Sequence, residues 1–232
     1  AGVEALAALG AVDFLMWVVT GISTGLTQGF SIQLSQYYGA KDFENLRKSL
    51  AHSYRLTAFI AAGVFILSQS FASLVLTGLH TPSNIIGMSL LYLRIIFCGI
   101  PATAAYNMFA SALRAMGNSK TPLTAMIIAS VLNVSLDLLF VAGFGWGVAG
   151  AAIATVIAQS FSAVYCFLIL RRIDIVHLTR ADFMPASGMN ARLMKLGIPV
   201  VFQNIIIGVG GLVVQYVING YGFLFVAGFT AT

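Results

Sequence analysis

Long apolar runs alternate along the chain with short stretches rich in glycine, proline and charged residues. A helix needs about 20 apolar residues to cross the hydrocarbon core of a bilayer. Five runs meet that length, at residues 5–38, 56–79, 123–142, 148–170 and 196–218. A sixth run, residues 85–113, qualifies although it contains Arg94 and Pro101. Segments of about ten alternating residues, typical of membrane barrels, do not occur. The pattern therefore predicts an all-α, polytopic membrane protein with six transmembrane helices.

Glycine and charge add detail to this pattern. Gly21, Gly25 and Gly29 recur every fourth residue, a spacing that favours close contact with another helix. Residues 43–55 carry several charges, and we expect them to form an amphipathic turn before the second membrane helix. The longest polar stretch, residues 171–195, divides the chain into an amino-terminal lobe (1–170), a linker (171–195) and the start of a second lobe (196–232).

A short internal echo supports this division. Residues 2–11 (GVEALAALGA) and 222–231 (GFLFVAGFTA) share one glycine and two alanines in register. Paired hydrophobic halves are typical of transporters. The sequence therefore suggests two related halves, with both ends of the chain cut at equivalent points.

Composition and charge agree with a membrane location. Hydrophobic residues make up 59% of the chain and charged residues 8%, against about 25% charge in soluble domains. The net charge of +5 does not indicate nucleic-acid binding, because the basic residues mark topology. Eleven of the twelve lie in alternate connections: Lys41, Arg47, Lys48, Arg55, Arg114, Lys120, Arg171, Arg172, Arg180, Arg192 and Lys195. The positive-inside rule places these connections in the cytoplasm.

Asp137 lies inside the otherwise uncharged run 123–142. A carboxylate at the centre of a membrane helix costs roughly 2.5–3.5 kcal/mol on insertion scales, so such a residue marks a functional site by default. Asn133 and Ser130 share its helical face. The alternative is a helix–helix contact in which these polar groups satisfy one another.

We do not expect an enzyme. An intramembrane aspartyl protease needs two acids, and Asp13 lies near a helix start, where we expect it to cap the helix or face water. A serine enzyme needs a histidine at membrane depth, whereas the histidines lie in or beside loops. Cys98 and Cys166 lack metal-ligand spacing and are expected to pack. No cofactor is expected.

The chain resembles the multidrug and toxic compound extrusion (MATE) family of cation-coupled antiporters over essentially its whole length. The resemblance rests on GVEALAALG, QLSQYYGAKD, YLRIIFCGIPATAAYNMFASALRAMGNSKTP and NVSLDLLFVAGFGWGVAGAAIATVIAQ, in this order and spacing. It implies two six-helix lobes around a central cavity, of which this chain supplies family helices two to seven. It also implies a multi-pass protein of the inner (plasma) membrane that is monomeric at full length.

The resemblance to the DNA-damage-inducible (DinF-like) branch implies a Na⁺ or proton site. Asn133 and Asp137 match the branch's pair on helix five, Thr155 matches its threonine on helix six, and the main-chain carbonyl one turn earlier is that of Ala151. Tyr92 matches a tyrosine of the same network. From the residues alone, Thr155 is equally a hydroxyl bonded to its own helix, whereas Tyr92 is better interpreted as an interfacial aromatic residue.

The implied function is secondary export of amphipathic, often cationic, organic compounds in exchange for Na⁺ or H⁺. The expected partners are this small-molecule substrate and membrane lipid. Candidate cavity residues are Ser130, Met126, Met108 and Phe109, because flexible thioethers and aromatic rings tolerate varied ligands; ordinary packing is the alternative for the last three. Two other functions stay open: flipping of a lipid-linked saccharide, and a membrane scaffold that does not transport.

Overall fold

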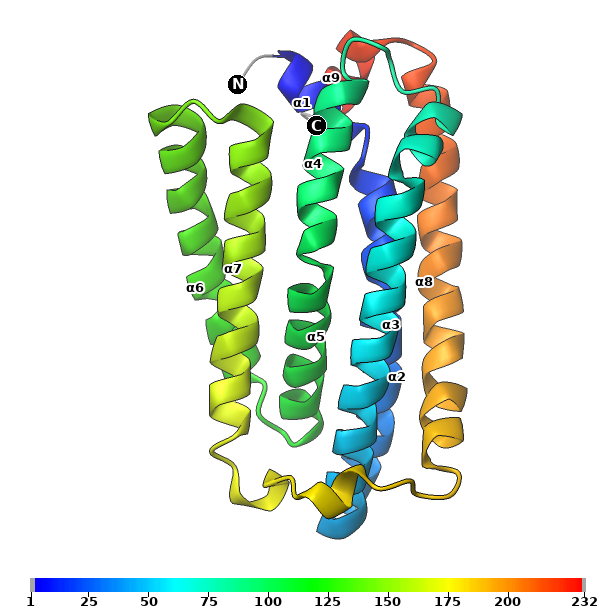
Figure 1. The fold of residues 1–232 in the computed structure, drawn as a ribbon, viewed down its shortest axis with the longest axis vertical. Helices are drawn as coiled ribbons and strands as arrows, with labels where there is room; N and C mark the ends of the chain where they lie inside the picture. Colours follow the sequence, from blue (N-terminus) through cyan, green and yellow to red (C-terminus); the bar gives the residue numbers. More distant parts are fainter. Residues whose placement is uncertain (1–2, 231–232) are drawn as a thin grey trace.

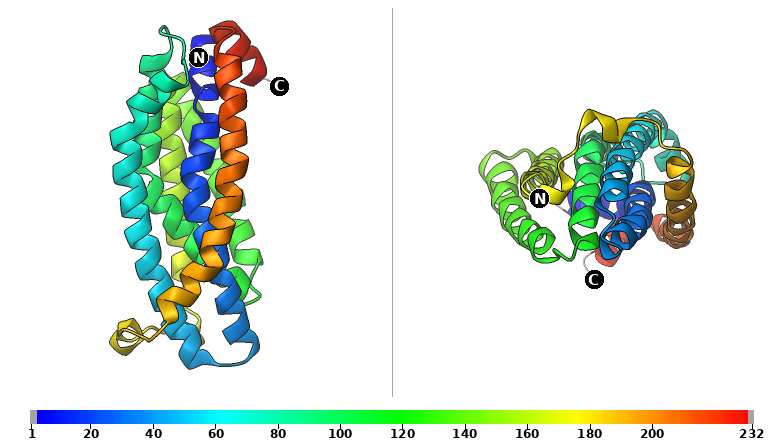
Figure 2. Two further views of the ribbon diagram at one scale, coloured as in Figure 1. Left: turned by 90° about the vertical axis from the view of Figure 1, so that its right-hand side faces the viewer. Right: turned by 90° about the horizontal axis from the view of Figure 1, so that it is seen from below.

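Helices form almost the entire protein, and among the residues that the computed structural model describes, 3–230, there is no strand. The helices are α1 (Val3–Gly10), α2 (Asp13–Gly39), α3 (Phe43–Gly78), α4 (Ile86–Cys98), α5 (Ile100–Ala115), α6 (Lys120–Asp137), η1 (Leu138–Gly143), α7 (Gly147–Leu170), η2 (Asp174–Val176), η3 (Arg180–Phe183), α8 (Met189–Asn219) and α9 (Phe223–Thr230). The long helices stand side by side along the longest axis of the molecule (Figures 1 and 2).

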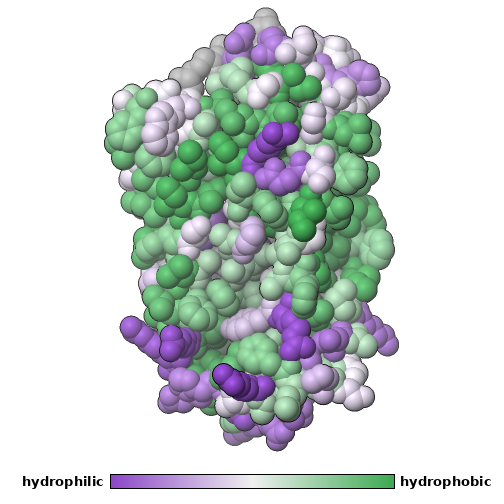
Figure 3. Space-filling model, viewed as in Figure 1, coloured by the Kyte–Doolittle hydropathy of each residue, from purple (hydrophilic) through white to green (hydrophobic). Residues whose placement is uncertain are grey.

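Five helical segments are long and apolar enough to cross a membrane, and the bent pair α4–α5 makes a sixth span. This confirms the predicted all-α class with six transmembrane helices. A broad hydrophobic band covers the middle of the molecule, and hydrophilic residues gather at both ends (Figure 3). The pair α4–α5 bends by 46°, at Gly99 and just before Pro101, whose ring nitrogen has no hydrogen to donate.

The basic connections all lie at one end of the bundle, opposite the two termini (Figure 1). These are the connections α2–α3, α5–α6 and α7–α8. The grouping predicted from the charge pattern is therefore present, and the cytoplasmic location of this end stays a prediction. Helix α8 begins at Met189, inside the range 171–195 predicted as a linker, so the connection is shorter than expected. The division into two lobes stays a prediction.

The expectation for residues 43–55 was wrong, because this stretch is the first part of the continuous helix α3. The backbone N–H of Asn45 donates to Oδ1 of the N-cap residue Asp42 at 3.1 Å, which fixes the start of the helix. At 1.5 Å per residue, the 36 residues of α3 span about 54 Å, well beyond a hydrocarbon core of about 30 Å. One end of α3 therefore projects into the basic region.

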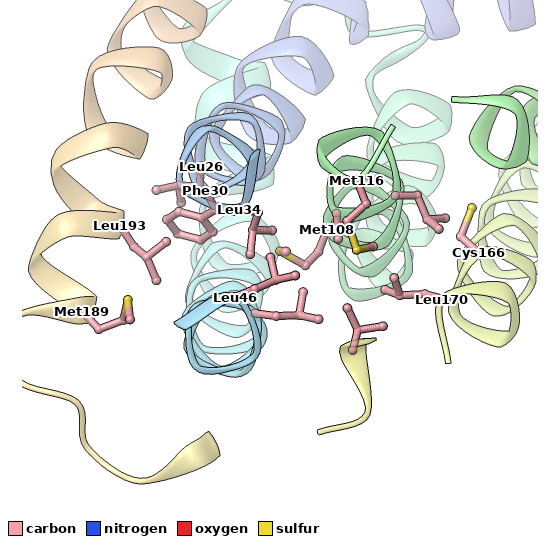
Figure 4. Packing of buried hydrophobic residues seen from close by; sticks show 14 of the residues in the cluster. Leu26, Phe30, Leu34, Leu46, Met108, Met116, Cys166, Leu170, Met189 and Leu193 are labelled. Carbon is pink, nitrogen blue, oxygen red and sulfur yellow. The ribbon is translucent and has the colours of Figure 1, made fainter. Parts of the chain in front are cut away.

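The glycine spacing in α2 correctly predicts a close helix contact, and the partner is α8. A Cβ atom built on Gly29 would lie 2.3 Å from the Cα of Gly197, and one built on Gly25 would lie 2.8 Å from the Cα of Val201. Leu26 and Phe30, which follow two of these glycines in α2, belong to the same buried cluster as Leu193 of α8 (Figure 4). The backbones of α2 and α8 therefore touch directly, with a hydrophobic core beside the contact.

The two segments of the internal echo lie side by side in space. Helix α1 contacts α9, and Ala7, Ala8 and Ala11 share a buried cluster with Ile218 and Val226. Positions 2 and 231 of the echo lie outside the described residues. The two similar segments, α1 and α9, therefore pack against each other at the end of the bundle opposite the basic connections.

Candidate functional site

Polar side chains of α6 and α7 meet in the part of the bundle where the sequence places a cation site. The Asn133 amide nitrogen donates to Thr155 Oγ1 at 3.4 Å, and Thr155 Oγ1 donates to the main-chain carbonyl of Ala151 at 3.0 Å. The structure therefore brings these three residues together. The alternative for Thr155, a hydroxyl bonded to its own helix, is also realised, because the same hydroxyl takes part in both contacts.

Asp137 ends α6, and the π-helical segment η1 begins at the next residue. Its Oδ1 is buried and has no hydrogen-bond partner among the described residues. π-Helical turns are uncommon and occur often at functional sites, and a buried polar atom without a partner calls for an explanation such as a bound ion. The side chain of Asp137 thus offers a free oxygen ligand inside the apolar span.

Tyr92 of α4 adjoins this acid. Only 7% of Tyr92 is exposed, so it packs inside the protein, and its part in the site network stays a prediction. It interacts electrostatically with both Asp137 and Asp13. Asp13 begins α2 directly after the helix break at residues 11–12, which confirms its expected position at a helix start. Its interaction with Tyr92 was not expected from the sequence, and the helix break is what places this acid there.

A cavity of about 210 Å³ lies between α5, α6 and α7. Ser130, Met126, Asn133 and Thr155 line it. Substrate binding by the first two stays a prediction. Gln159, which the sequence analysis missed, also lines it, and its Oε1 is buried without a hydrogen-bond partner in the described chain. Its position four residues after Thr155 places it on the same helical face, which is the pattern that predicts it.

Met108 and Phe109 do not line this cavity but a separate one between α3, α5 and α7, and their role in binding substrate stays a prediction. Met108 is 1% exposed and belongs to the hydrophobic core. The ring of Phe109 packs edge-on against Tyr54 at 5.5 Å and lies 5.3 Å from the ring of Phe167. The direction of the side chains on α5 explains this. Tyr106 faces the α6–α7 cavity, and Met108, two residues later, points about 200° away from Tyr106 around the helix axis, at about 100° per residue.

The donor set of this region suits a weakly held hard cation or a proton. A carboxylate, an amide oxygen, a hydroxyl and a main-chain carbonyl are oxygen ligands of the kind that Na⁺ accepts. Which end of the Asn133 amide faces Thr155 is an assignment, because amide oxygen and nitrogen are exchanged by a 180° rotation. Among residues 3–230 no three His, Cys, Asp or Glu side chains form a metal-binding group. A proton needs only the carboxylate.

Comparison with known proteins identifies relatives of this chain. The MatE family model matches residues 1–139. The chain is 34% identical over 230 residues to the "Probable multidrug resistance protein YpnP" of Bacillus subtilis, covering 99% of this chain and 52% of that protein. It is 24% identical over 208 residues to the "Multidrug export protein MepA" of Staphylococcus aureus (strain NCTC 8325 / PS 47), covering 88% and 46%.

Solved structures show the same fold. The structure described as the inward-facing conformation of a multidrug resistance MATE family transporter of the MOP superfamily superposes with a TM-score of 0.92 at 24% identity, over 99% of this chain and 53% of that one. A MATE structure in complex with MaD3S gives a TM-score of 0.81 over 88% and 46%. The chain thus spans about half the length of the relatives it matches.

Proposed function

The chain belongs to the MATE family, and we propose that it forms one half of a secondary transporter that exports amphipathic, often cationic, organic compounds in exchange for Na⁺ or H⁺. Relatives that match it are named multidrug resistance and multidrug export proteins. The chain covers 52% of YpnP, so the proposed activity is that of the complete transporter. We place it as a multi-pass monomer in the plasma membrane, with 1–170 in one lobe and the helix that follows the connection at the start of the other.

The observation that carries this proposal is the unpartnered, buried Oδ1 of Asp137 inside an apolar span. A free carboxylate at this depth is costly, and binding of a cation or a proton removes that cost. An exchanger requires a site whose occupancy changes the relative stability of two conformations. Asp137 supplies such a site because Tyr92, on which its charge acts, belongs to another helix, so occupancy affects how α4 and α6 pack.

The two coupling ions make different demands on the site. Na⁺ needs further oxygen ligands, and the candidates are Asn133, one helical turn before Asp137, and the Thr155 hydroxyl and Ala151 carbonyl that contact it or each other on α7. H⁺ needs Asp137 alone. The ligand arrangement therefore accommodates either ion. Substitution of Thr155 distinguishes the two, because it removes a ligand that Na⁺ needs and H⁺ does not.

The cavity beside the site favours export of cations over the handling of lipid-linked pyrophosphates. The residues that line it are uncharged, whereas an anionic headgroup calls for arginine or lysine at close range. Its hydroxyl and amide groups, together with Met126, provide a mixed polar and adaptable wall.

The test is ion-driven efflux by the complete transporter in liposomes. We expect Asp137→Asn to abolish coupled export while expression and membrane insertion are retained, because the substitution preserves size and removes the charge. Ser135→Ala is the matched control, since Ser135 is an exposed residue of α6 whose hydroxyl donates to the Val131 carbonyl of its own helix. Export by Asp137→Asn at the rate of the control under the same gradient would show that Asp137 does not couple the ion, and a non-transporting scaffold would then be the better description.

A further inference from the structure

A second, larger groove lies on another face of the bundle, between α3, α5 and α7. Figure 1 shows α5 between the other two helices, with the α7–α8 connection running across their lower ends. The groove has a volume of about 420 Å³, within the roughly 300–1,000 Å³ of ligand sites. Its walls are alanine and aromatic side chains, including Ala58, Ala62, Ala105 and Phe109. Small residues of α3 and α5, with Phe167 of α7 beside them, therefore leave an apolar slot in the hydrophobic band.

A second cavity, whose wall includes charged and polar side chains, adjoins this slot at the basic end of the molecule. The second cavity has a volume of about 400 Å³ and shares Tyr54 and Phe167 with the first. Arg171 and His177 contribute polar groups to its wall. Hydrophilic residues border the lower end of the hydrophobic band in the same view (Figure 3). An apolar slot and a cavity with a basic wall residue thus lie next to each other at the basic end of the molecule.

We propose that the slot and the adjoining cavity together bind an anionic glycerophospholipid of the leaflet at the basic end, with one acyl chain in the slot and the phosphate beside Arg171. Basic pockets between membrane helices on the cytoplasmic side are the usual binding sites of anionic headgroups. The slot accepts hydrocarbon, and the guanidinium of Arg171 presents several donors to phosphate oxygens. The slot therefore suits the acyl chain of such a lipid, and Arg171 suits its phosphate.

Charge around the lower cavity supports an anionic ligand. Arg171 forms no ion pair within residues 3–230. The acid nearest in sequence, Asp174, faces His177 at 3.7 Å, and Asp182 is buried and faces Arg47. The carbonyl end of α7 opposes anion binding, but that effect equals about half a charge and is confined to the last turn. The full charge of Arg171 outweighs it.

Thr57 provides an independent indication. It lines the slot, its side chain is 7% exposed, and its Oγ1 has no hydrogen-bond partner among the described residues. It follows Tyr54, the residue shared by both cavities, by three positions on α3 and so lies about one helical turn above the junction. The ester carbonyls of a phospholipid lie between its phosphate and its chains, at this level. The free hydroxyl of Thr57 is a suitable donor to such a carbonyl.

The test is lipid retention by the purified, delipidated protein, measured by native mass spectrometry during titration with phosphatidylglycerol or phosphatidylcholine of identical acyl chains. We expect one phosphatidylglycerol to bind with clear preference. Arg171→Gln should weaken this binding about fivefold, the contribution of one basic residue near an anionic lipid surface. Arg172→Gln is the matched control, because Arg172 is an exposed neighbour that does not line either cavity.

A second pair of variants tests the slot without changing charge. Ala62→Phe fills the slot and should abolish retention, whereas Val164→Phe, at an exposed position of α7 outside the groove, should not. Equal retention of the two lipids, or equal effects within either pair of variants, would overturn the proposal. Displacement of phosphatidylglycerol by inorganic phosphate at the same concentration would also overturn it, by assigning the basic cavity to a free anion.

Discussion

Gly29→Ala tests the direct contact between α2 and α8. A Cβ at position 29 would lie 2.3 Å from the Cα and 2.6 Å from the nitrogen of Gly197, whereas ordinary contacts begin at 3.4 Å. The added methyl group therefore needs about 1.1 Å of extra space from Gly197. Both obstructing atoms belong to the backbone and cannot move away by side-chain rotation. The helices themselves must separate.

The expected cost follows from two opposing terms. Overpacking of a well-packed contact costs up to about 3 kcal/mol, and replacement of glycine by alanine inside a helix gains about 1 kcal/mol. Gly29→Ala should therefore destabilise the protein by about 2 kcal/mol. Gly63→Ala is the control, because nothing lies within 4 Å of a Cβ built on Gly63 in α3, and it should stabilise by up to about 1 kcal/mol.

The measurement is reversible unfolding in mixed micelles, followed by the loss of helical circular dichroism. We expect the free energies of unfolding of the two variants to differ by about 3 kcal/mol, with Gly29→Ala the less stable. Equal stabilities, or a stabilised Gly29→Ala protein, would refute the backbone contact between α2 and α8. The placement of α8 against α2 would then be wrong.

Three further predictions concern the site, the topology and the α7–α8 connection. Thr155→Ala should weaken Na⁺-driven export more than H⁺-driven export in liposomes, since a proton needs no second ligand; equal losses would contradict a role in Na⁺ binding. Cysteines introduced at the exposed positions Lys41 and Ser187 should resist labelling from outside intact cells, whereas one at Ser83 should react. The reverse pattern would invert the topology. His52→Ala should speed hydrogen exchange in residues 171–188, because His52 lies 3.0 Å from the Met184 carbonyl and anchors the connection to α3. Unchanged exchange would show that this contact does not hold the connection.

Length and hydrophobicity predict the spans because a membrane leaves the backbone little alternative to helix. The glycine spacing predicts a contact surface for a similar reason, since only small residues let two backbones touch. The pattern does not name the partner helix. Gly197 lies far along the chain in α8, and no local periodicity links it to Gly29.

The extent of α3 is harder to predict because its polar first part contacts a distant segment. Arg47 faces Asp182 at 3.8 Å, and His52 Nδ1 lies 2.7 Å from Asn190 Oδ1. The charges that suggest a separate amphipathic turn in residues 43–55 instead serve tertiary contacts of one continuous helix. Tertiary contacts of this kind override local pattern, and they involve residues more than 100 positions apart.

The candidate cation site illustrates the same limit at the level of chemistry. A polar stripe on one face of a regular helix is readable from spacing, so Asn133 and Asp137 stand out. Asp13 does not, because its relevance depends on a helix break that brings it near Tyr92. The π-helical turn after Asp137 likewise has no clear sequence signal. A helix break precedes Asp13 and a π-helical turn follows Asp137, the two acids that interact with Tyr92. Such irregular points are expected if ion binding needs oxygen atoms that regular helical hydrogen bonds do not occupy. Residues at such irregular points are the ones to substitute first when the coupling mechanism is mapped.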